Sequence, residues 1–284
     1  MHPIDHQMVL VTGATSGLGR ALARRLAAAG AHVIAHGRDP ARLARTRDEI
    51  LAATGRTVHT VRADLAELAQ VQRMAGEVLH RYPRLHALVN NAGVGFGPPG
   101  GRREVSADGI ELRFAVNHLA GYLLVRRLAG LLIASAPARI VQVASAGQQA
   151  LDPADPLTER HYDGVTAYQR AKLAQVMATV ELAAELAGTG VSVNAIHPAT
   201  LMDTAMVREA GFMPRSSVEE GVDAVWWLLT DPTLDGVSGR YFEGTRLAQP
   251  HPSVRDPTAR AWLRRLSDSL IARSLGHADE RAGN

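Results

Sequence analysis

The chain has 284 residues, of which 46% are hydrophobic and 21% charged. The hydrophobic residues can form the core of one large domain spanning residues 1–284. It has no cysteine, which excludes disulfides, thiolate nucleophiles and cysteine metal sites. The net charge is only +3 and acidic residues are interleaved with the arginines. The composition therefore favours an arginine-rich bias over a nucleic-acid-binding surface, and we expect no nucleic-acid partner.

The sequence contains neither a charged segment followed by a long apolar one at its start nor a run of about 18 uninterrupted apolar residues. We therefore expect a soluble, cytoplasmic protein with no membrane partner. A homo-oligomer, either dimer or tetramer, and a monomer remain open alternatives.

Short β-branched runs alternate with longer amphipathic segments rich in alanine and leucine over the first 200 residues. We expect strands at residues 8–12, 32–36, 57–61, 85–90, 138–144, 191–196 and 239–243. We expect helices at residues 18–29, 40–53, 67–81, 109–134 and 166–188. This order predicts a single-domain, Rossmann-like α/β fold with a doubly wound parallel sheet of about seven strands flanked by helices, and a core at about 8–245.

Three segments outside this alternation have their own patterns. Residues 200–217 have mixed polarity and follow the sixth strand, which predicts a mobile substrate lid. Residues 253–274 form an amphipathic C-terminal helix by their pattern, and we expect 275–284 to be frayed. The glycine- and proline-rich residues 94–103 predict a surface loop rather than a domain boundary.

Gly13, Gly17 and Gly19 stand directly after the first strand and at the start of the first helix. Glycine lets the backbone approach a pyrophosphate, and the helix N-terminus supplies unpaired N–H groups, so the turn predicts a dinucleotide site. A turn that merely reverses the chain is the alternative, and the strand–turn–helix context favours binding.

Further motifs follow in a fixed order along the chain: TGATSGLG at 12–19, NNAG at 90–93, AVNHLAGYLL around Asn117, Ser145 after the fifth strand, Tyr168-x-x-x-Lys172, and HPAT at 197–200. Together they resemble the short-chain dehydrogenase/reductase family from residue 8 to about 245. The amino-acid sequence of 109–143 is most similar to the retinol-dehydrogenase-like branch of that family. The resemblance implies cofactor contacts from Gly13, Thr15, Ser16, Gly17, Leu18, Gly19, Asp64, Leu65, Asn91, Ala92, Gly93, Tyr168, Lys172, Pro198 and Thr200.

The end of the second strand bears on the choice of nicotinamide cofactor. An NAD-selective enzyme usually has a carboxylate there, whereas this chain has Gly37 followed by Arg38. Because a guanidinium pairs with a 2′-phosphate, Arg38 predicts NADP(H), with NAD(H) the less favoured alternative. Arg38 could instead belong to the arginine-rich composition and point into water.

Tyr168 and Lys172 are four residues apart in an expected helix, so their side chains project from the same face. An ammonium about 4 Å from a phenol favours phenolate by roughly 4 kcal/mol at an effective dielectric near 20, which predicts a tyrosine pKa lowered by up to about three units. Lys172 is the single lysine of the sequence. Arginine would supply the same charge, so its retention indicates a need for the compact ammonium, which by resemblance also binds the nicotinamide ribose.

The resemblance assigns the other catalytic roles. Ser145 would hydrogen-bond the substrate oxygen, and Asn117 would hold a water that links Lys172 to solvent, a role compatible with an amide bridging backbone segments. His118 and His197 have no further ligands at useful spacing, so we expect no metal site.

The last motif, HPAT, departs from the family's usual His-Pro-Gly because Ala199 replaces the glycine. If this position needs a positive φ, the turn would be strained or shifted.

These residues predict an NADP(H)-dependent oxidoreductase that transfers a hydride between nicotinamide and a carbonyl or secondary alcohol carbon. Loops 94–106, 147–165 and 200–217 should line the substrate pocket. Phe96, Met202, Met206 and Phe212 suggest an apolar small-molecule substrate, with inward packing of each side chain as the alternative. The alternative is a non-catalytic regulatory protein that senses NAD(P) on the same fold.

Overall fold

The computed structural model describes residues 3–98 and 100–282 and is a single α/β domain. Its sheet has the strand order β3-β2-β1-β4-β5-β6-β7-β8. The strands are β1 (Met8–Val11), β2 (His32–Gly37), β3 (His59–Arg62), β4 (Ala87–Asn90), β5 (Ala138–Val143), β6 (Val191–His197), β7 (Tyr241–Glu243) and β8 (Arg246–Leu247). Neighbouring strands pair in parallel except β7 and β8. The predicted fold class is confirmed, with the short antiparallel β8 in addition to the expected strands.

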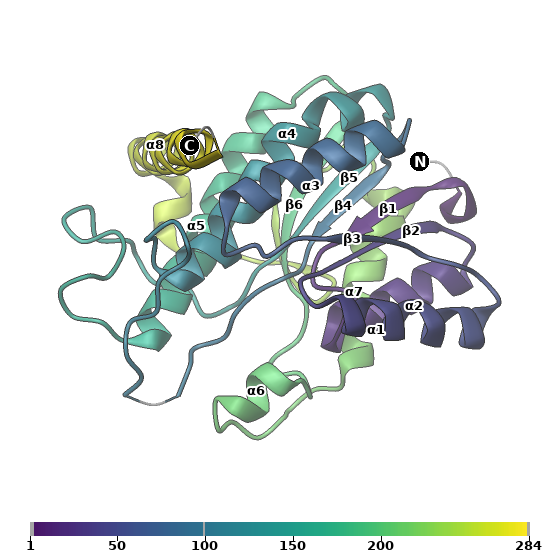
Figure 1. Cartoon of the computed structure of the whole chain (residues 1–284), viewed down its shortest axis with the longest axis horizontal. Helices are drawn as coiled ribbons and strands as arrows, with labels where there is room; N and C mark the ends of the chain where they lie inside the picture. The colour runs from purple at the N-terminus through teal and green to yellow at the C-terminus, as the bar shows by residue number, and fades with distance from the viewer. Residues whose placement is uncertain (1–2, 99, 283–284) are drawn as a thin grey trace.

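Helices cover both faces of the sheet (Figure 1). One face carries α1 (Gly17–Ala28), α2 (Pro40–Thr54) and α7 (Val218–Thr230), and the other carries α3 (Leu68–Arg81), α4 (Ala120–Ala134) and α5 (Gly164–Glu185). Successive strand residues enter opposite cores: in β4, Val89 packs with the first group of helices and Leu88 with the second. The central strands β1 and β4, whose residues enter both cores, are therefore largely apolar.

The strand order reverses between β1 and β4, the position at which a doubly wound sheet opens its binding crevice. From β1 the chain builds outward through β2 and β3, and then returns to pair β4 with the opposite edge of β1. Ligands of doubly wound sheets bind at such a reversal, outside the carboxyl ends of the strands. The glycine-rich turn after β1 and residues 90–93 after β4 meet at this place.

Two helical segments differ from the sequence prediction. No helix was predicted at α7, although Ser217 and Glu220 form a capping box at its start. The helix predicted over 109–134 begins later, because Gly109 has a φ of +73° and Glu111 forms an isolated β-bridge with Val105. It starts with a π-helical turn, η2 (Phe114–Leu119), that continues into α4.

The C-terminal helix α8 (Pro257–Ala282) is longer than the predicted 253–274 and follows a 3-10 turn, η4 (Pro252–Arg255). Residues 275–282, which we expected to be frayed, are helical, and 283–284 lie outside the described residues. Helix α8, seen nearly end-on in Figure 1, contacts α3 and α5. Its buried Ser267 hydroxyl lies 2.8 Å from His118 Nε2, and Arg260 Nε donates to Glu181 at 2.6 Å.

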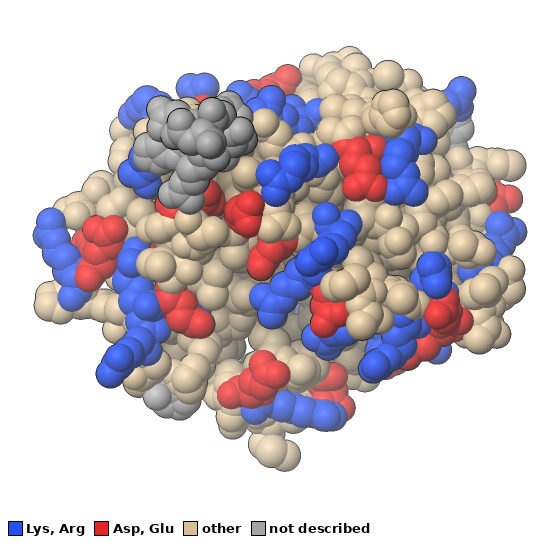
Figure 2. Space-filling view, in the orientation of Figure 1, with Lys and Arg blue, Asp and Glu red and all other residues tan. Residues whose placement is uncertain are grey.

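The predicted lid segment 200–217 holds the short helix α6 (Ala205–Glu209), which projects from the body of the domain (Figure 1). Two further 3-10 turns are η1 (Ile4–His6) and η3 (Pro232–Leu234). None of the helices in residues 3–98 and 100–282 has the length and apolar character that a membrane crossing requires. On the face shown in Figure 2, basic and acidic side chains are interspersed.

Candidate active site

The turn after β1 brings backbone atoms unusually close together. Gly13 and Gly17 have φ values of +66° and +48°. A Cβ atom on Gly19 would lie 2.3 Å from the Gly13 carbonyl oxygen and 2.4 Å from Asn91 Nδ2. Ser16 caps α1 without a side-chain hydrogen bond, so N–H groups of the first turn remain directed out of the helix. The turn has the shape and polarity of an anion cradle.

Thr12 and Asn91 join this turn to the end of β4. Asn91 Nδ2 donates to the Thr12 carbonyl at 2.8 Å, and Thr12 Oγ1 accepts from the N–H groups of Asn91 and Ala92 at 2.9 and 3.0 Å. The Asn91 side chain, predicted to contact a cofactor, therefore braces the two strand ends. Leu18 lies in the core beneath the turn.

His36 is a site residue that the sequence prediction missed. Its Nδ1 accepts from the Gly13 N–H at 3.1 Å, and its Nε2 lies 3.1 Å from the Ala63 carbonyl. Burial lowers the pKa of His36 to about 4, opposed by the Ala63 hydrogen bond and the Asp64 charge. His36 is therefore neutral and ties the glycine turn to β3. A polar residue within the apolar run of β2 was the available signal.

Arg38 follows β2 at the rim of the crevice and is exposed. Its carbonyl accepts a hydrogen bond from Arg62 Nε at 3.1 Å, so a second arginine lies at the same edge. A Cβ on the adjacent Gly37 would lie 2.5 Å from Thr15 Cγ2, so glycine permits the glycine-rich turn to pack here.

The turn after β3 is closed by its own polar groups. Asp64 Oδ1 accepts from the Ala66 N–H at 2.9 Å, and the Asp64 N–H donates to Gln70 at 2.9 Å. Leu65 is buried in the core. The structure therefore gives both predicted cofactor residues a structural role at the crevice edge.

Ser145, Tyr168 and Lys172 come together at the carboxyl end of β5. Lys172, from α5, is 4% exposed, and its Nζ donates to the Val143 carbonyl at 2.7 Å and to Gln175 Oε1 at 3.3 Å. Its ammonium lies 5.8 Å from the centroid of the Tyr168 ring. The Tyr168 hydroxyl shares a hydrogen bond with Ser145. A phenol, a hydroxyl and an ammonium thus form one buried cluster.

The prediction that Lys172 lowers the pKa of Tyr168 was wrong for the protein alone. Burial raises the pKa of Tyr168, and the Ser145 hydrogen bond only partly opposes this rise. Burial also lowers the pKa of Lys172 to about 8. The ammonium has its hydrogen bonds with Val143 and Gln175 rather than with the phenol, so desolvation dominates both groups.

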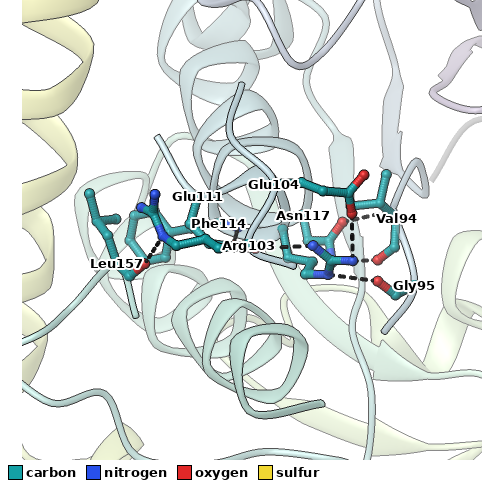
Figure 3. A network of polar contacts seen from close by, with 9 residues as sticks. Val94, Gly95, Arg103, Glu104, Glu111, Phe114, Asn117 and Leu157 are labelled. Carbon is teal, nitrogen blue, oxygen red and sulfur yellow. Dashed lines mark hydrogen bonds and ion pairs between the residues drawn. The ribbon is translucent and has the colours of Figure 1, made fainter. Parts of the chain in front are cut away.

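Asn117 lies in the π-helical turn and fixes the chain after β4. Its Oδ1 accepts from the Val94 N–H at 2.8 Å, and its Nδ2 donates to the Val94 carbonyl at 3.0 Å (Figure 3). A Cβ on Gly93 would lie 3.2 Å from Asn117 Oδ1 and 3.8 Å from Lys172 Nζ. Asn117 and Lys172 therefore flank the same glycine. A cavity of about 10 Å³ is bordered by Asn117 and by Gln175, the hydrogen-bond partner of Lys172.

Apolar side chains from two loops cover the catalytic cluster. The Phe96 ring lies 4.4 Å from the Tyr168 ring and 5.7 Å from the Phe212 ring, measured between centroids. Met206 packs against Gly95, where a Cβ would lie 2.7 Å from its Cγ. Met202 instead packs against Gly221 of α7.

The HPAT turn is not strained at Ala199. Among the described residues, the non-glycine residues with positive φ are Thr158 and Leu201, the latter at 48°. Thr200 Oγ1 lies 3.1 Å from His197 Nε2, and the Thr200 carbonyl accepts from Ser216 at 2.9 Å. The residue with left-handed backbone, Leu201, therefore lies after Thr200. The described residues also contain no group of three or more histidines and carboxylates suited to a metal.

Comparisons with known proteins agree with this geometry. The family model described as short chain dehydrogenase matches residues 7–213. Retinol dehydrogenase 14 of Mus musculus is 35% identical over 93% of this chain and 85% of its own length.

Two solved structures have the same fold. A short chain dehydrogenase from Escherichia coli CFT073, complexed with NADPH, has a TM-score of 0.70 and 27% identity and covers 85% of this chain and 97% of its own. The 3-ketoacyl-(acyl-carrier-protein) reductase of Brucella melitensis, complexed with NADH, has a TM-score of 0.68 and 26% identity over 84% of this chain and 97% of its own. The chain is therefore an oxidoreductase that belongs to the short-chain dehydrogenase/reductase family, in its retinol-dehydrogenase-like branch.

Proposed function

We propose that the protein is an NADP(H)-dependent oxidoreductase that interconverts a carbonyl group and a secondary or primary alcohol of an apolar small molecule. The observation that carries this proposal is the buried cluster of Ser145, Tyr168 and Lys172, which lies beside the glycine-rich cradle. A proton donor and an anion site then face the same crevice.

The residues of the crevice fit a dinucleotide. Gly13, Gly17 and the first turn of α1 would hold the pyrophosphate, because both glycines have a positive φ and the first turn of α1 has no side-chain cap. Arg38 at the rim would pair with the 2′-phosphate of NADP(H), with Arg62 adding positive charge beside it. When bound, the nicotinamide supplies or accepts the hydride.

Tyr168 acts as the proton donor in carbonyl reduction. Because burial raises its pKa, the phenol is protonated near neutral pH, which is the state a general acid requires. Ser145, hydrogen-bonded to the same hydroxyl, orients the substrate oxygen. In alcohol oxidation the same groups accept the proton.

Lys172 and Asn117 support this proton transfer. Lys172 is largely protonated at neutral pH with a pKa of about 8, so it favours the phenolate left when Tyr168 gives up its proton. The small cavity beside Asn117 and Gln175 is close to the size of one water, which would resupply the proton through Lys172.

The apolar cover supports an apolar substrate. The Phe96 ring packs against Tyr168, and Phe212 packs edge-on against Phe96 and keeps 44% of its surface exposed. Similarity to proteins named retinol dehydrogenase agrees with a hydrophobic alcohol or aldehyde. The alternative, a regulatory protein that binds NAD(P) without turnover, has no use for the assembled Ser145, Tyr168 and Lys172.

Replacement of Tyr168 by Phe tests the function. NADPH oxidation is measured with a panel of all-trans-retinal, acetophenone and hexanal, and NADPH affinity is measured by fluorescence titration. Loss of the general acid should lower kcat by about 10²- to 10⁴-fold with NADPH affinity retained. Equal rates in the variant and the parent would reject Tyr168 as the acid, and NADPH binding without any turnover would favour the regulatory alternative.

A further inference from the structure

The loop that carries Phe96 is anchored by a buried arginine. Arg113, only 3% exposed, donates from Nε to the Gly95 carbonyl at 2.9 Å. Its other nitrogens pair with Glu111 at 3.3 Å and with Glu104 at 3.0 Å. Figure 3 shows Glu104, Asn117, Val94 and Gly95 gathered at this contact.

The chain around Phe96 is shaped to fit this anchor. Gly97 has a φ of +77°, and a Cβ on it would lie 2.7 Å from Arg113 Nη2. A Cβ on Gly164, the first residue of α5, would lie 2.0 Å from the Phe96 carbonyl oxygen. Gly95 therefore accepts a hydrogen bond from the guanidinium, Gly97 leaves room for it, and the Phe96 carbonyl lies against the first residue of the helix that bears Tyr168.

The charges around Arg113 make this anchor rigid. Glu111 is 1% exposed and its Oε2 also accepts from the Phe114 N–H at 2.8 Å, at the start of the π-helical turn. The Arg113 guanidinium thus joins the start of the π-helical turn to the loop at Gly95. Asn117, four residues further along the chain, holds the same loop at Val94. A planar fork reaches the Gly95 carbonyl and two carboxylates together, whereas an ammonium on a flexible stem does not.

We propose that Arg113 is a positioning residue that holds the backbone of Gly95 and Gly97 so that the Phe96 ring shields the Tyr168 hydroxyl and forms the inner wall of the substrate pocket. The proposal rests on the proposed function for its consequence, which is control of substrate access to Tyr168. Its geometric part stands independently of turnover, because it concerns the exposure of one phenol.

Nitration of Tyr168 by tetranitromethane, followed by peptide mass spectrometry, measures that exposure without a substrate. The variants are Arg113→Lys, which keeps a charge beside Glu111, Phe96→Ala, and the double variant. Tyr82, buried at the end of α3, is the internal standard for global unfolding.

Arg113→Lys and Phe96→Ala should each raise the nitration rate of Tyr168 by about tenfold. In the first variant the charge-assisted hydrogen bond that holds the loop is lost, and in the second the ring that covers Tyr168 is absent. In the double variant the rate should equal that of Phe96→Ala alone, since Arg113 acts through Phe96. The matched control is Arg103→Lys: Arg103 ties the same loop to the Leu157 carbonyl at 3.2 Å but does not contact Gly95, so Tyr168 should nitrate at the parent rate.

Steady-state kinetics with the fastest-reacting carbonyl of the panel gives a second readout. Arg113→Lys should raise the KM for that carbonyl by about tenfold and leave NADPH affinity unchanged, because the cradle is untouched. Parent-like nitration in Arg113→Lys, an Arg113 effect that persists without Phe96, or an equal rise at Tyr82 would each overturn the proposal. Failure of turnover with intact nitration results would count against the proposed function alone.

Discussion

The number of hydrogen-bond acceptors around a buried position decides which basic residue fits there. Lys172 Nζ has two acceptors, Val143 O and Gln175 Oε1, in a buried setting. An arginine would bring five donors to the same place and leave several unsatisfied. This accounts for the one lysine in a sequence whose other basic residues, apart from histidines, are all arginines.

Arg38 sets the choice between the two nicotinamide cofactors if it pairs with the 2′-phosphate. Arg38→Ala should weaken NADPH binding by about tenfold or more, because a charge-assisted hydrogen bond is lost, and should leave NADH binding unchanged. Fluorescence titration with both nucleotides checks this, with Arg47→Ala of α2, paired with Asp48, as the control for loss of charge. Equal weakening for NADPH and NADH would contradict the assignment.

At the scale of elements, the order of strands and most helices could be predicted from periodicity, because each buries a continuous apolar face. The turn after β1 was predictable as well, since only glycine tolerates its contacts. Helix α7 and the π-helical start of α4 were not predicted. The first lay beyond the regular alternation, and the second depends on the Glu111 contact with Phe114 and on the Asn117 contact with Val94, 23 residues away.

The roles within the site divide in the same way. Tyr168 and Lys172 were found from a local motif and Ser145 from the order of the motifs along the chain, and the three are brought together in space. The pKa direction of Tyr168 was not predictable, because it depends on how completely Phe96 and the sheet bury the phenol. His36 and Arg113 escaped for a related reason: their partners include backbone groups, the Gly13 N–H and the Gly95 carbonyl, that only the fold brings near them.

Alanine replacement should have opposite effects at a crowded glycine of the turn after β1 and at an open glycine of α3. Gly19→Ala should abolish NADPH binding and destabilise the fold, because its Cβ would lie 2.3 Å from the Gly13 carbonyl oxygen. The control is Gly76→Ala, at an open position of α3, which should stabilise the protein by about 0.8–1 kcal/mol through helix propensity. Urea unfolding and fluorescence titration measure both effects. Normal NADPH binding by Gly19→Ala would show that the cradle is misassigned.

At the scale of the whole molecule, the sheet separates two cores, and buried histidines couple their stability to pH. Burial lowers the pKa of His36 to about 4 and that of His118 to about 3. Both are neutral in the folded protein, whereas the unfolded chain binds protons below the ordinary histidine pKa of about 6.5.

The free energy of unfolding should therefore fall as the pH drops from about 6.5 toward 4, by about 1.4 kcal/mol per pH unit for each such histidine. His118→Gln should reduce this slope by the contribution of one histidine, about 1.4 kcal/mol per pH unit. Urea unfolding of the parent and the variant at pH values from 7.5 to about 4.5 measures the difference. Identical slopes would contradict the assignment of His118 as a neutral, buried group.

The central claim is that this crevice transfers a hydride to a carbonyl carbon while Tyr168 supplies the proton. The most direct measurement uses NADPH deuterated at C4, on each face in turn, with the panel carbonyl that reacts fastest, and mass spectrometry of the alcohol. Deuterium should appear on the carbinol carbon from one of the two faces. NADPH oxidation that leaves the alcohol free of deuterium from either face would contradict it.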